Sequence, residues 1–471
     1  MEKLSSQDAG FLKIESPHCP FHVAGLMILK LPDSRRGDYM ARLVRKCGRL
    51  NELWPAFNKK LYDPVNLSAP AWVPAADYDP AQHVLHYALP APGHMRHLLR
   101  LVTRAHERPL DRSRPLWELH VIEGLGGDRF ALYCKVHHAL VDGVGAMKMM
   151  QSLLSTSPEQ RLRVDRAQPP HKNPNGDHSL FQALDELRRG LRKQYRAIPE
   201  LSRLLAHMGA DAIQGKTDVM RLPFTAPRTI FNCELDSSRA IAICELSLAS
   251  VRKIARQAGG SINDVLLSVC GGALRRYLQG QKSLPEGSLV AGMPVSLKTG
   301  ADSAGNKLSY IIAPFFTDEG NSWRRLKRVI KVTRAAKGEL GQVSTTAAED
   351  YYALLMAPTL LLTLTGNATL LRPGINAIFS NVPGARENLY LEGARLQALY
   401  PLSIVTDGMG LNITVVSHAG KLCFAIISCP IRQPGIADLG KMIKESFAEL
   451  QAAACAVQLS GPPATPARQR T

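Results

Sequence analysis

The sequence has no C-x-x-C pair and no recognisable export signal. Its nine cysteines stand at positions 19, 47, 134, 233, 244, 270, 423, 429 and 455. Cysteine-based zinc modules and dithiol redox sites need closely spaced pairs, so the spacing disfavours both. The N-terminal residues also lack the apolar core and cleavage site of a secretory signal. We therefore expect free thiols in a reducing cytoplasm.

Aromatic residues are scarce, at 6 % of the chain, whereas positive charge is abundant. The formal net charge is +18, which favours an anionic partner such as nucleic acid, an anionic membrane surface or a phosphorylated molecule. A nucleic-acid binder would be expected to carry a basic recognition helix or stacking aromatics, and neither is visible. We expect no nucleic-acid partner, and charge alone does not choose between the other two.

Charge is absent altogether from Tyr351–Leu371, a segment long enough to cross a bilayer of about 30 Å. Pro358, four threonines and the Gly366-Asn367 pair weaken that interpretation without excluding it. We expect a buried helix, or one that dips into a lipid surface.

The length of 471 residues suits two domains, and 45 % hydrophobic residues make the composition globular. Strand-like alternation is mixed with helical spacing in both halves, which predicts two mixed α/β domains. We place the first domain at residues 1–160 and the second at 231–455. A proline-rich linker with a basic amphipathic helix separates them at 161–230, and a disordered tail follows at 456–471.

The stretch KVHHALVDGVG, residues 135–145, follows a predicted hairpin in which two apolar runs flank GLGGD at 124–128. Adjacent histidines project to opposite faces of a strand, so they cannot easily bind one metal ion together. The helical HExxH pattern of zinc proteases is also missing. We expect no metal here.

The alternative is proton transfer. If the strand continues regularly through the pair, His138 lies on its apolar, inward face and His137 shares the face of Lys135. A neutral imidazole there can accept a proton near neutral pH. Asp142 can hold the following loop through an arginine or backbone N–H groups, or bond an imidazole directly, and Gly143 permits a tight turn into a helix. A core histidine without a catalytic role fits the same pattern.

HHxxxDG after an alternating strand resembles the signature of the CoA-dependent acyltransferase superfamily, which includes chloramphenicol acetyltransferase and the condensation domains of peptide synthetases. Further blocks make the chain similar to the bacterial wax ester synthase / acyl-CoA:diacylglycerol acyltransferase family. In chain order they are LSSQDAGFLKIESPHCPFHVAGLMIL, PLDRSRPLWELHVIEGL, SINDVLLSVCGGALRRYL, AGMPVSL and FSNVPG. The resemblance runs from Leu4 to about Cys455, and ordered blocks are more specific than HHxxxDG alone.

This resemblance implies two chloramphenicol-acetyltransferase-like α/β domains with an active-site tunnel between them. It implies transfer of a fatty acyl group from acyl-CoA to a long-chain alcohol, giving a wax ester, or to diacylglycerol, giving triacylglycerol. The second histidine of the motif, His138, would be the general base. We expect His137 and Asp142 to position His138 or its loop, with Asp142 mainly structural.

Asn263 belongs to the SIND block, where Ser261 can cap a helix and Asp264 lies in its first turn. Asn263 is then near the positive end of that helix, where it could donate a hydrogen bond to the thioester oxyanion. Its alternative role is to hold the helix start in place.

Pro294, Ser296, Ser380 and Asn381, with Gly384 beside them, are expected to shape the tunnel wall near the acyl donor or to hold the domains together. A G-x-S-x-G nucleophile elbow is absent, so no covalent acyl-enzyme is expected. Acyl-CoA is then a substrate, and no cofactor is needed.

Asn263 and Ser380 flank the uncharged segment, so a single membrane crossing would separate two blocks expected to line one tunnel. A helix at the tunnel mouth that receives lipid fits better, and the basic stretch Ser322–Lys337 could add attraction to that surface or be merely solvated. We expect a cytoplasmic protein, peripherally bound to the inner face of the membrane or to lipid droplets. The alternatives are a condensation-type acyltransferase using carrier-bound thioesters and a non-catalytic lipid-surface protein.

Overall fold

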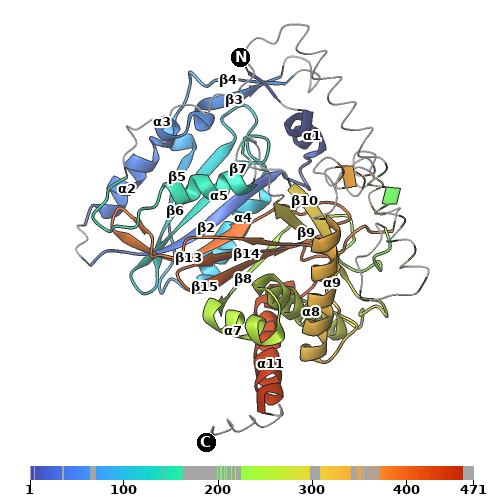
Figure 1. Cartoon of the computed structure of the whole chain (residues 1–471). Helices are drawn as coiled ribbons and strands as arrows, with labels where there is room; N and C mark the ends of the chain where they lie inside the picture. The colour runs from blue at the N-terminus through green and yellow to red at the C-terminus, as the bar shows by residue number, and fades with distance from the viewer. Residues whose placement is uncertain are drawn as a thin grey trace, which may run out of the picture.

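The computed structural model describes residues 2–4, 6–33, 37–63, 70–141, 143–162, 224–296, 308–340 and 372–459, with single residues between 199 and 218 and between 347 and 369. Most of the predicted linker 161–230 and of Tyr351–Leu371 therefore lies outside the described residues. Two six-stranded sheets dominate the molecule, and a small three-stranded sheet is attached to them (Figure 1).

The first sheet has the strand order β12-β13-β2-β7-β6-β5. Its strands are β2 (His22–Lys30), β5 (Val84–Ala88), β6 (Trp117–Leu125), β7 (Arg129–His137), β12 (Tyr390–Leu391) and β13 (Ala394–Leu402). The predicted hairpin is confirmed, because β6 and β7 pair antiparallel across a turn with Gly127 and Asp128 at positive φ. The helices of this half are α1 (Ser6–Ile14), α2 (Tyr39–Cys47), α3 (Leu50–Leu53), α4 (Met95–Glu107) and α5 (Gly143–Ser152).

The second sheet has the order β10-β9-β11-β14-β15-β8. Its strands are β8 (Ala240–Ser247), β9 (Val290–Ser296), β10 (Leu308–Pro314), β11 (Ala377–Val382), β14 (Leu411–His418) and β15 (Lys421–Ser428). Its helices are α7 (Leu248–Ala258), α8 (Ile262–Gly280), α9 (Ser322–Leu340) and α11 (Leu439–Leu459). Because α11 extends to Leu459, the first residues of the predicted tail 456–471 are helical. The small sheet contains β1 (Glu2–Lys3), β3 (Lys59–Tyr62) and β4 (Ala71–Pro74), and short 3-10 helices lie at Pro55–Asn58, Pro80–Gln82 and Ile436–Asp438.

One strand pairing joins segments far apart in the sequence. β13 comes from the second half of the chain but pairs antiparallel with β2 of the first half, from Arg395 opposite Lys30 to Leu402 opposite Ala24. The first sheet is therefore completed by residues that follow most of the second domain, a feature that contiguous boundaries at 160 and 231 do not describe. β13 also packs against β14 and β15, so the two sheets share a core.

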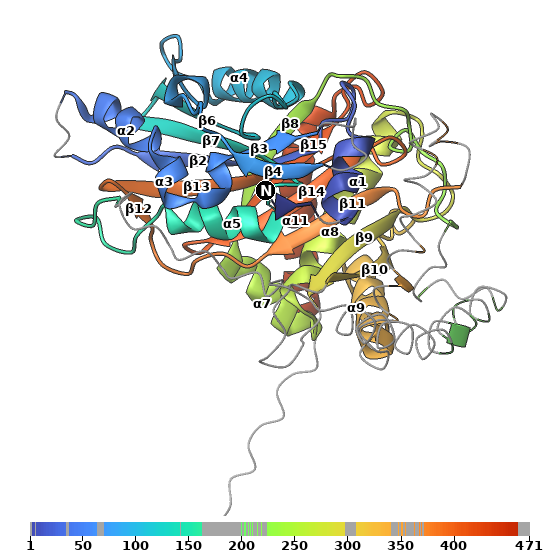
Figure 2. The ribbon, with the colours of Figure 1, turned by 90° about the horizontal axis from the view of Figure 1, so that it is seen from above.

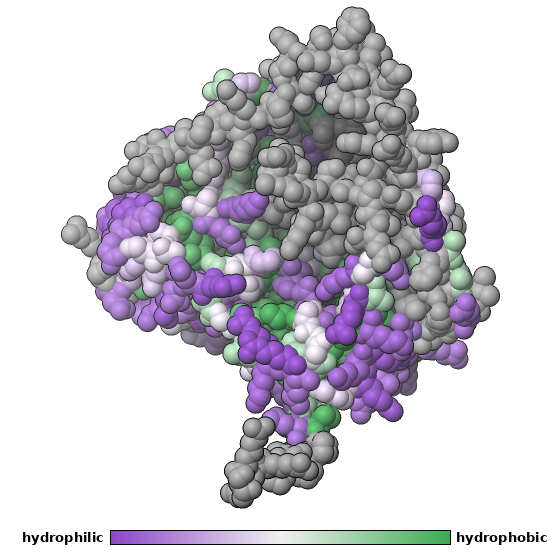
Figure 3. Space-filling model, viewed as in Figure 1, coloured by the Kyte–Doolittle hydropathy of each residue, from purple (hydrophilic) through white to green (hydrophobic). Residues whose placement is uncertain are grey.

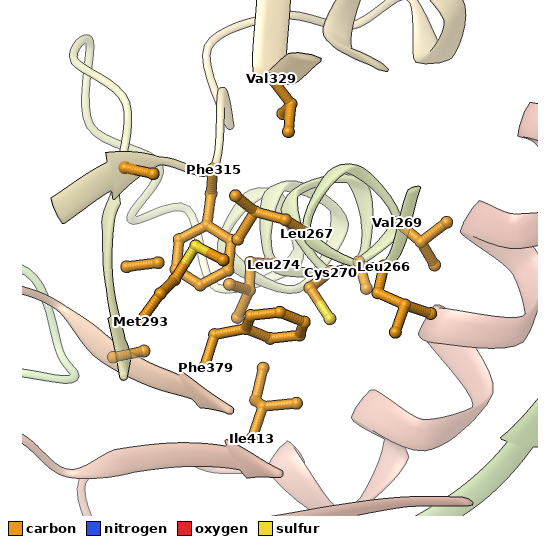
Figure 4. Packing of buried hydrophobic residues seen from close by; sticks show 14 of the residues in the cluster. Leu266, Leu267, Val269, Cys270, Leu274, Met293, Phe315, Val329, Phe379 and Ile413 are labelled. Atoms are coloured by element: carbon orange, nitrogen blue, oxygen red, sulfur yellow. The ribbon is translucent and has the colours of Figure 1, made fainter. Parts of the chain in front are cut away.

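Helices cover the face of the second sheet that is opposite to the face packed against β13. α8 lies against the strands through Leu267, Cys270 and Leu274, which point toward Met293 and Phe379 (Figure 4). A side chain at Gly271 would place its Cβ 2.0 Å from the carbonyl oxygen of Phe315, so only glycine allows this close approach.

Hydrophilic side chains gather over the lower part of the described surface, where α7 and α9 lie (Figure 3). Among the residues that the structure describes, no helix combines the length and apolar character needed to cross a membrane. The predicted mixed α/β fold with a sheet in each half is confirmed.

Candidate active site

The paired histidines stand at the end of β7, and the strand stops between them. His137 is its last residue and His138 opens the turn that follows. The backbone N–H of His137 donates to Leu116 O at 3.0 Å, and that of His138 donates to Phe21 O at 2.8 Å. His137 is fully buried, whereas His138 is partly exposed.

The expectation from strand alternation was therefore wrong in its premise. Every residue of β7 after Arg129 is buried, on both faces, because structure covers the sheet on each side. Alternation also cannot be extended to His138, since that residue has left the strand. What distinguishes the two histidines in the structure is their burial.

The ring of His137 is fixed by two contacts. Its Nδ1 accepts the backbone N–H of Ala139 at 3.0 Å, so the neutral ring carries its proton on Nε2. Nε2 lies 3.3 Å from Oε1 of Glu15, and the same oxygen accepts the N–H of Phe21 at 2.9 Å. Glu15 therefore touches both the ring beside His138 and the segment that holds the His138 backbone.

Arg112, whose side chain is 36 % exposed, completes this cluster. Its Nε and Nη2 lie 3.1 and 2.9 Å from Glu15 Oε2, and Nη2 also donates to Leu12 O at 2.6 Å. Burial alone would raise the pKa of Glu15, but the nearby His137 ring and the hydrogen bonds from Phe21 and Arg112 outweigh it, so the pKa lies below its ordinary value. Glu15 and Arg112 were not predicted as site residues, because no periodicity marks them.

The ring of His138 packs edge-on against Phe11 of α1, with centroids 4.6 Å apart. Phe11 in turn stacks on Phe21 at 5.8 Å. The base candidate thus has an apolar wall on one side. Asp142 lies outside the described residues, and α5 begins at Gly143 as predicted. No group of three or more potential metal ligands occurs in the described parts of the chain.

In the second half, the start of α8 has the predicted capping box. Asp264 N–H donates to Ser261 Oγ at 3.3 Å, and Ser261 N–H donates to Asp264 Oδ2 at 2.6 Å. The other oxygen of Asp264 accepts the hydroxyl of Thr333 in α9 at 2.6 Å. Both carboxylate oxygens of this buried aspartate are thus used to hold the helix start.

The side chain of Asn263, the residue before Asp264, contacts the second sheet and takes no part in the capping box. Asn381 Nδ2 donates to Asn263 Oδ1 at 2.5 Å, which joins the first turn of α8 to β11. β11 runs parallel to β9, with Ile378 opposite Gly292. Pro294 and Ser380 stand two residues further along each strand.

The remaining candidates of the second half lie at the same carboxyl ends of parallel strands, the usual ligand side of such sheets. Ser296 is the last residue of β9, and its side chain is outside the described part. Gly384 donates its N–H to Ser417 Oγ at 3.0 Å, and a Cβ there would meet Ser417 O at 2.0 Å. Gly384 therefore allows two backbones to approach closely.

The helix α1, which carries Phe11 against His138, lies near β9 and β10 of the second sheet in both views (Figures 1 and 2). The first half thus contributes a partly exposed imidazole, and the second half contributes a pair of amides at a helix N-terminus. Such groups can remove a proton and stabilise a developing oxyanion.

Known proteins match the chain along nearly its whole length. The wax ester synthase/diacylglycerol acyltransferase catalytic domain family matches residues 4–266, and the C-terminal domain of the same family matches 304–451. A putative diacylglycerol O-acyltransferase of Mycobacterium tuberculosis is 36 % identical over 456 residues, covering 96 % of this chain and 99 % of that protein. The O-acyltransferase WSD of Acinetobacter baylyi is 33 % identical, covering 95 % and 96 %.

Solved structures agree with this relationship. The wax ester synthase/diacylglycerol acyltransferase from Marinobacter aquaeolei VT8 superposes with a TM-score of 0.77 at 31 % identity, covering 97 % of this chain and all of that one. The first condensation domain of the CDA synthetase, at 16 % identity and a TM-score of 0.57, shares the fold. The chain is a member of the wax ester synthase/diacylglycerol acyltransferase family, an acyltransferase built on two sheet-containing domains.

Proposed function

We propose that this protein transfers a fatty acyl group from acyl-CoA to the hydroxyl of a long-chain alcohol or of diacylglycerol, with His138 as the general base. The observation that carries this proposal is the unlike setting of the two histidines. His137 is buried and held by Ala139 N–H and Glu15, whereas the neighbouring His138 is partly exposed at a strand end. The names of the relatives, wax ester synthase and diacylglycerol O-acyltransferase, support the substrate classes.

The chemistry needs no covalent intermediate. His138 takes the proton of the acceptor hydroxyl, and the oxygen attacks the thioester carbonyl carbon. The tetrahedral oxyanion then collapses, the carbon–sulfur bond breaks, and protonated His138 returns the proton to the CoA thiolate. Asn263 and the N-terminus of α8 supply donors for the oxyanion.

His137 and Glu15 act through position. The contacts of His137 with Ala139 and Glu15 fix both sides of the ring, and the N–H of His138 is tied to Phe21 O. The base therefore projects from a turn whose backbone has little freedom, which keeps it near a productive geometry. Asp142 is assigned a structural role in the same loop.

We further propose a peripheral contact with an anionic membrane or lipid-droplet surface on the cytoplasmic side. The support is a set of basic residues on two adjacent helices, α7 and α9. The helices lie side by side because Lys327 and Arg334 of α9 donate to carbonyls at the end of α7. The exposed basic residues are Arg252, Lys253 and Arg256 of α7 and Arg324, Lys327, Lys331, Arg334 and Lys337 of α9. α7 has no acidic residue and α9 only Glu339. Each such cation near an anionic surface is worth about 1 kcal/mol, which co-sedimentation with lipid vesicles measures.

The test of the base is His138→Ala, assayed with palmitoyl-CoA and either hexadecanol or diacylglycerol by release of the CoA thiol. We expect kcat to fall by about 100- to 10,000-fold, because a positioned base contributes that much, while thermal unfolding stays unchanged. The matched control is His86→Ala, which changes a half-exposed histidine of β5. Full activity of the His138→Ala protein would show that His138 is not the base.

A further inference from the structure

Asn263 and Asn381 form a hydrogen bond with a defined direction. Asn381 is the donor, through Nδ2, and Asn263 is the acceptor, through Oδ1, at 2.5 Å. A side-chain amide carries one acceptor oxygen and one NH2 group on the same carbon. With its oxygen turned to Asn381, Asn263 must turn its NH2 group away from β11.

The backbone on both sides of this hydrogen bond is held by other contacts. The start of α8 is held by the capping box of Ser261 and Asp264 and by the hydroxyl of Thr333. Asn381 belongs to β11 and is paired there with Val415 of β14. Both backbones are thus fixed, and the remaining choice for Asn263 is which end of its amide faces the strand.

We propose that Asn381 is a positioning residue that orients the Asn263 amide, so that Asn263 presents its NH2 group to the thioester oxyanion. This inference rests on the proposed function, in which Asn263 is an oxyanion donor. It explains why an asparagine of the FSNVPG block meets an asparagine of the SIND block. An acceptor-only side chain at position 381 would reverse the amide and direct the oxygen of Asn263 at the negative charge.

The substitution that reverses the direction is Asn381→Asp. It is nearly isosteric, and because a carboxylate can only accept, it draws the NH2 group of Asn263 toward β11. We expect kcat to fall by about 100-fold, as for loss of one oxyanion donor, with KM for palmitoyl-CoA changed less than about twofold. Asn381→Ala, which leaves the amide without a preferred direction, should lower kcat by a smaller factor.

A double-mutant cycle separates orientation from other effects. Asn263→Ala removes the amide, so adding Asn381→Asp to it should cause no further loss of kcat. If the new carboxylate repelled the oxyanion directly, or if Asn381 acted only by packing, the two losses would multiply. Multiplied losses, or an Asn381→Asp protein with full activity, would overturn the inference.

The role of His138 as the base is tested independently of the asparagine double-mutant cycle. Activity lost in His138→Ala together with multiplied losses in the asparagine cycle would reject the orienting role alone. Full activity in His138→Ala would reject the proposed base whatever the cycle gives. Should Asn381→Asp unfold, Asn381→Ala and its double variant with Asn263→Ala provide the same comparison.

Discussion

Replacing Glu15 with glutamine removes one charge from the cluster behind the base while keeping its shape. The carboxylate is 5 % exposed and accepts two N–H groups of Arg112 and one of Phe21. Hydrogen bonds to charged groups contribute about 1.5–3 kcal/mol each, but Arg112 is 36 % exposed, which reduces its share. The amide keeps an acceptor for Phe21, so we expect the free energy of unfolding to fall by about 2 kcal/mol.

We expect the Glu15→Gln substitution to have a large effect on kcat and only a small effect on the melting temperature. The NH2 group of glutamine competes with the Nε2 proton of His137, which favours the other ring tautomer and takes the acceptor from Ala139 N–H. The turn then shifts, and a displacement of about 1 Å costs about 100-fold in rate. We expect kcat to drop by about 10- to 100-fold in the CoA-release assay, with a melting temperature about 4 °C lower. The matched control is Glu52→Gln, an exposed carboxylate that also pairs with an arginine.

The pH dependence gives a second readout. Because the folded protein holds the pKa of Glu15 below its ordinary value of 4.5, the charge stabilises the fold above that pH. This stabilisation is lost as the pH falls through the folded pKa. The difference in unfolding free energy between wild type and Glu15→Gln should therefore be largest near neutrality and shrink below about pH 4. A constant difference down to acid pH, or a fully active variant, would refute the assigned contacts.

Two further predictions concern packing and surface charge. Gly271→Ala places a Cβ 2.0 Å from Phe315 O and should lower the unfolding free energy by about 3 kcal/mol in urea titrations. Gly280→Ala in the same helix meets nothing within 4 Å and should be neutral or slightly stabilising, and equal effects at both positions would contradict the packing. Lys253→Glu with Lys337→Glu should weaken co-sedimentation with anionic vesicles by more than about tenfold and leave neutral vesicles unaffected. Undiminished binding would exclude the surface of α7 and α9 as the contact.

Local signals in the sequence predicted local structure well. The SIND block predicted a capping box, and Ser261 and Asp264 form it. The turn residues between two apolar runs predicted the β6–β7 hairpin, and Gly143 the start of α5. These features depend on contacts within a few residues, so composition and spacing suffice to find them.

Contacts between distant residues could not be predicted in this way. Glu15 and Arg112 are 97 positions apart, and nothing in the spacing of either links it to His137. Strand alternation also failed at His138, because the residue that ends a strand is decided by what packs around it. Asn263 and Asn381 were both singled out from the sequence, but the hydrogen bond between them emerged only from the fold.

The pairing of β13, from the second half of the chain, with β2 of the first sheet has a consequence for protein synthesis. A ribosome that has translated β2, β6 and β7 has not yet made Ala394–Leu402, so one edge of β2 lacks its partner until the chain is nearly complete. An unpaired sheet edge invites association with other chains. The nascent first half therefore needs shielding while the rest is translated, and a truncated gene product that ends before residue 394 should aggregate. Because β13 of the second half completes the first sheet, the two halves cannot be recombined as independent domains during evolution.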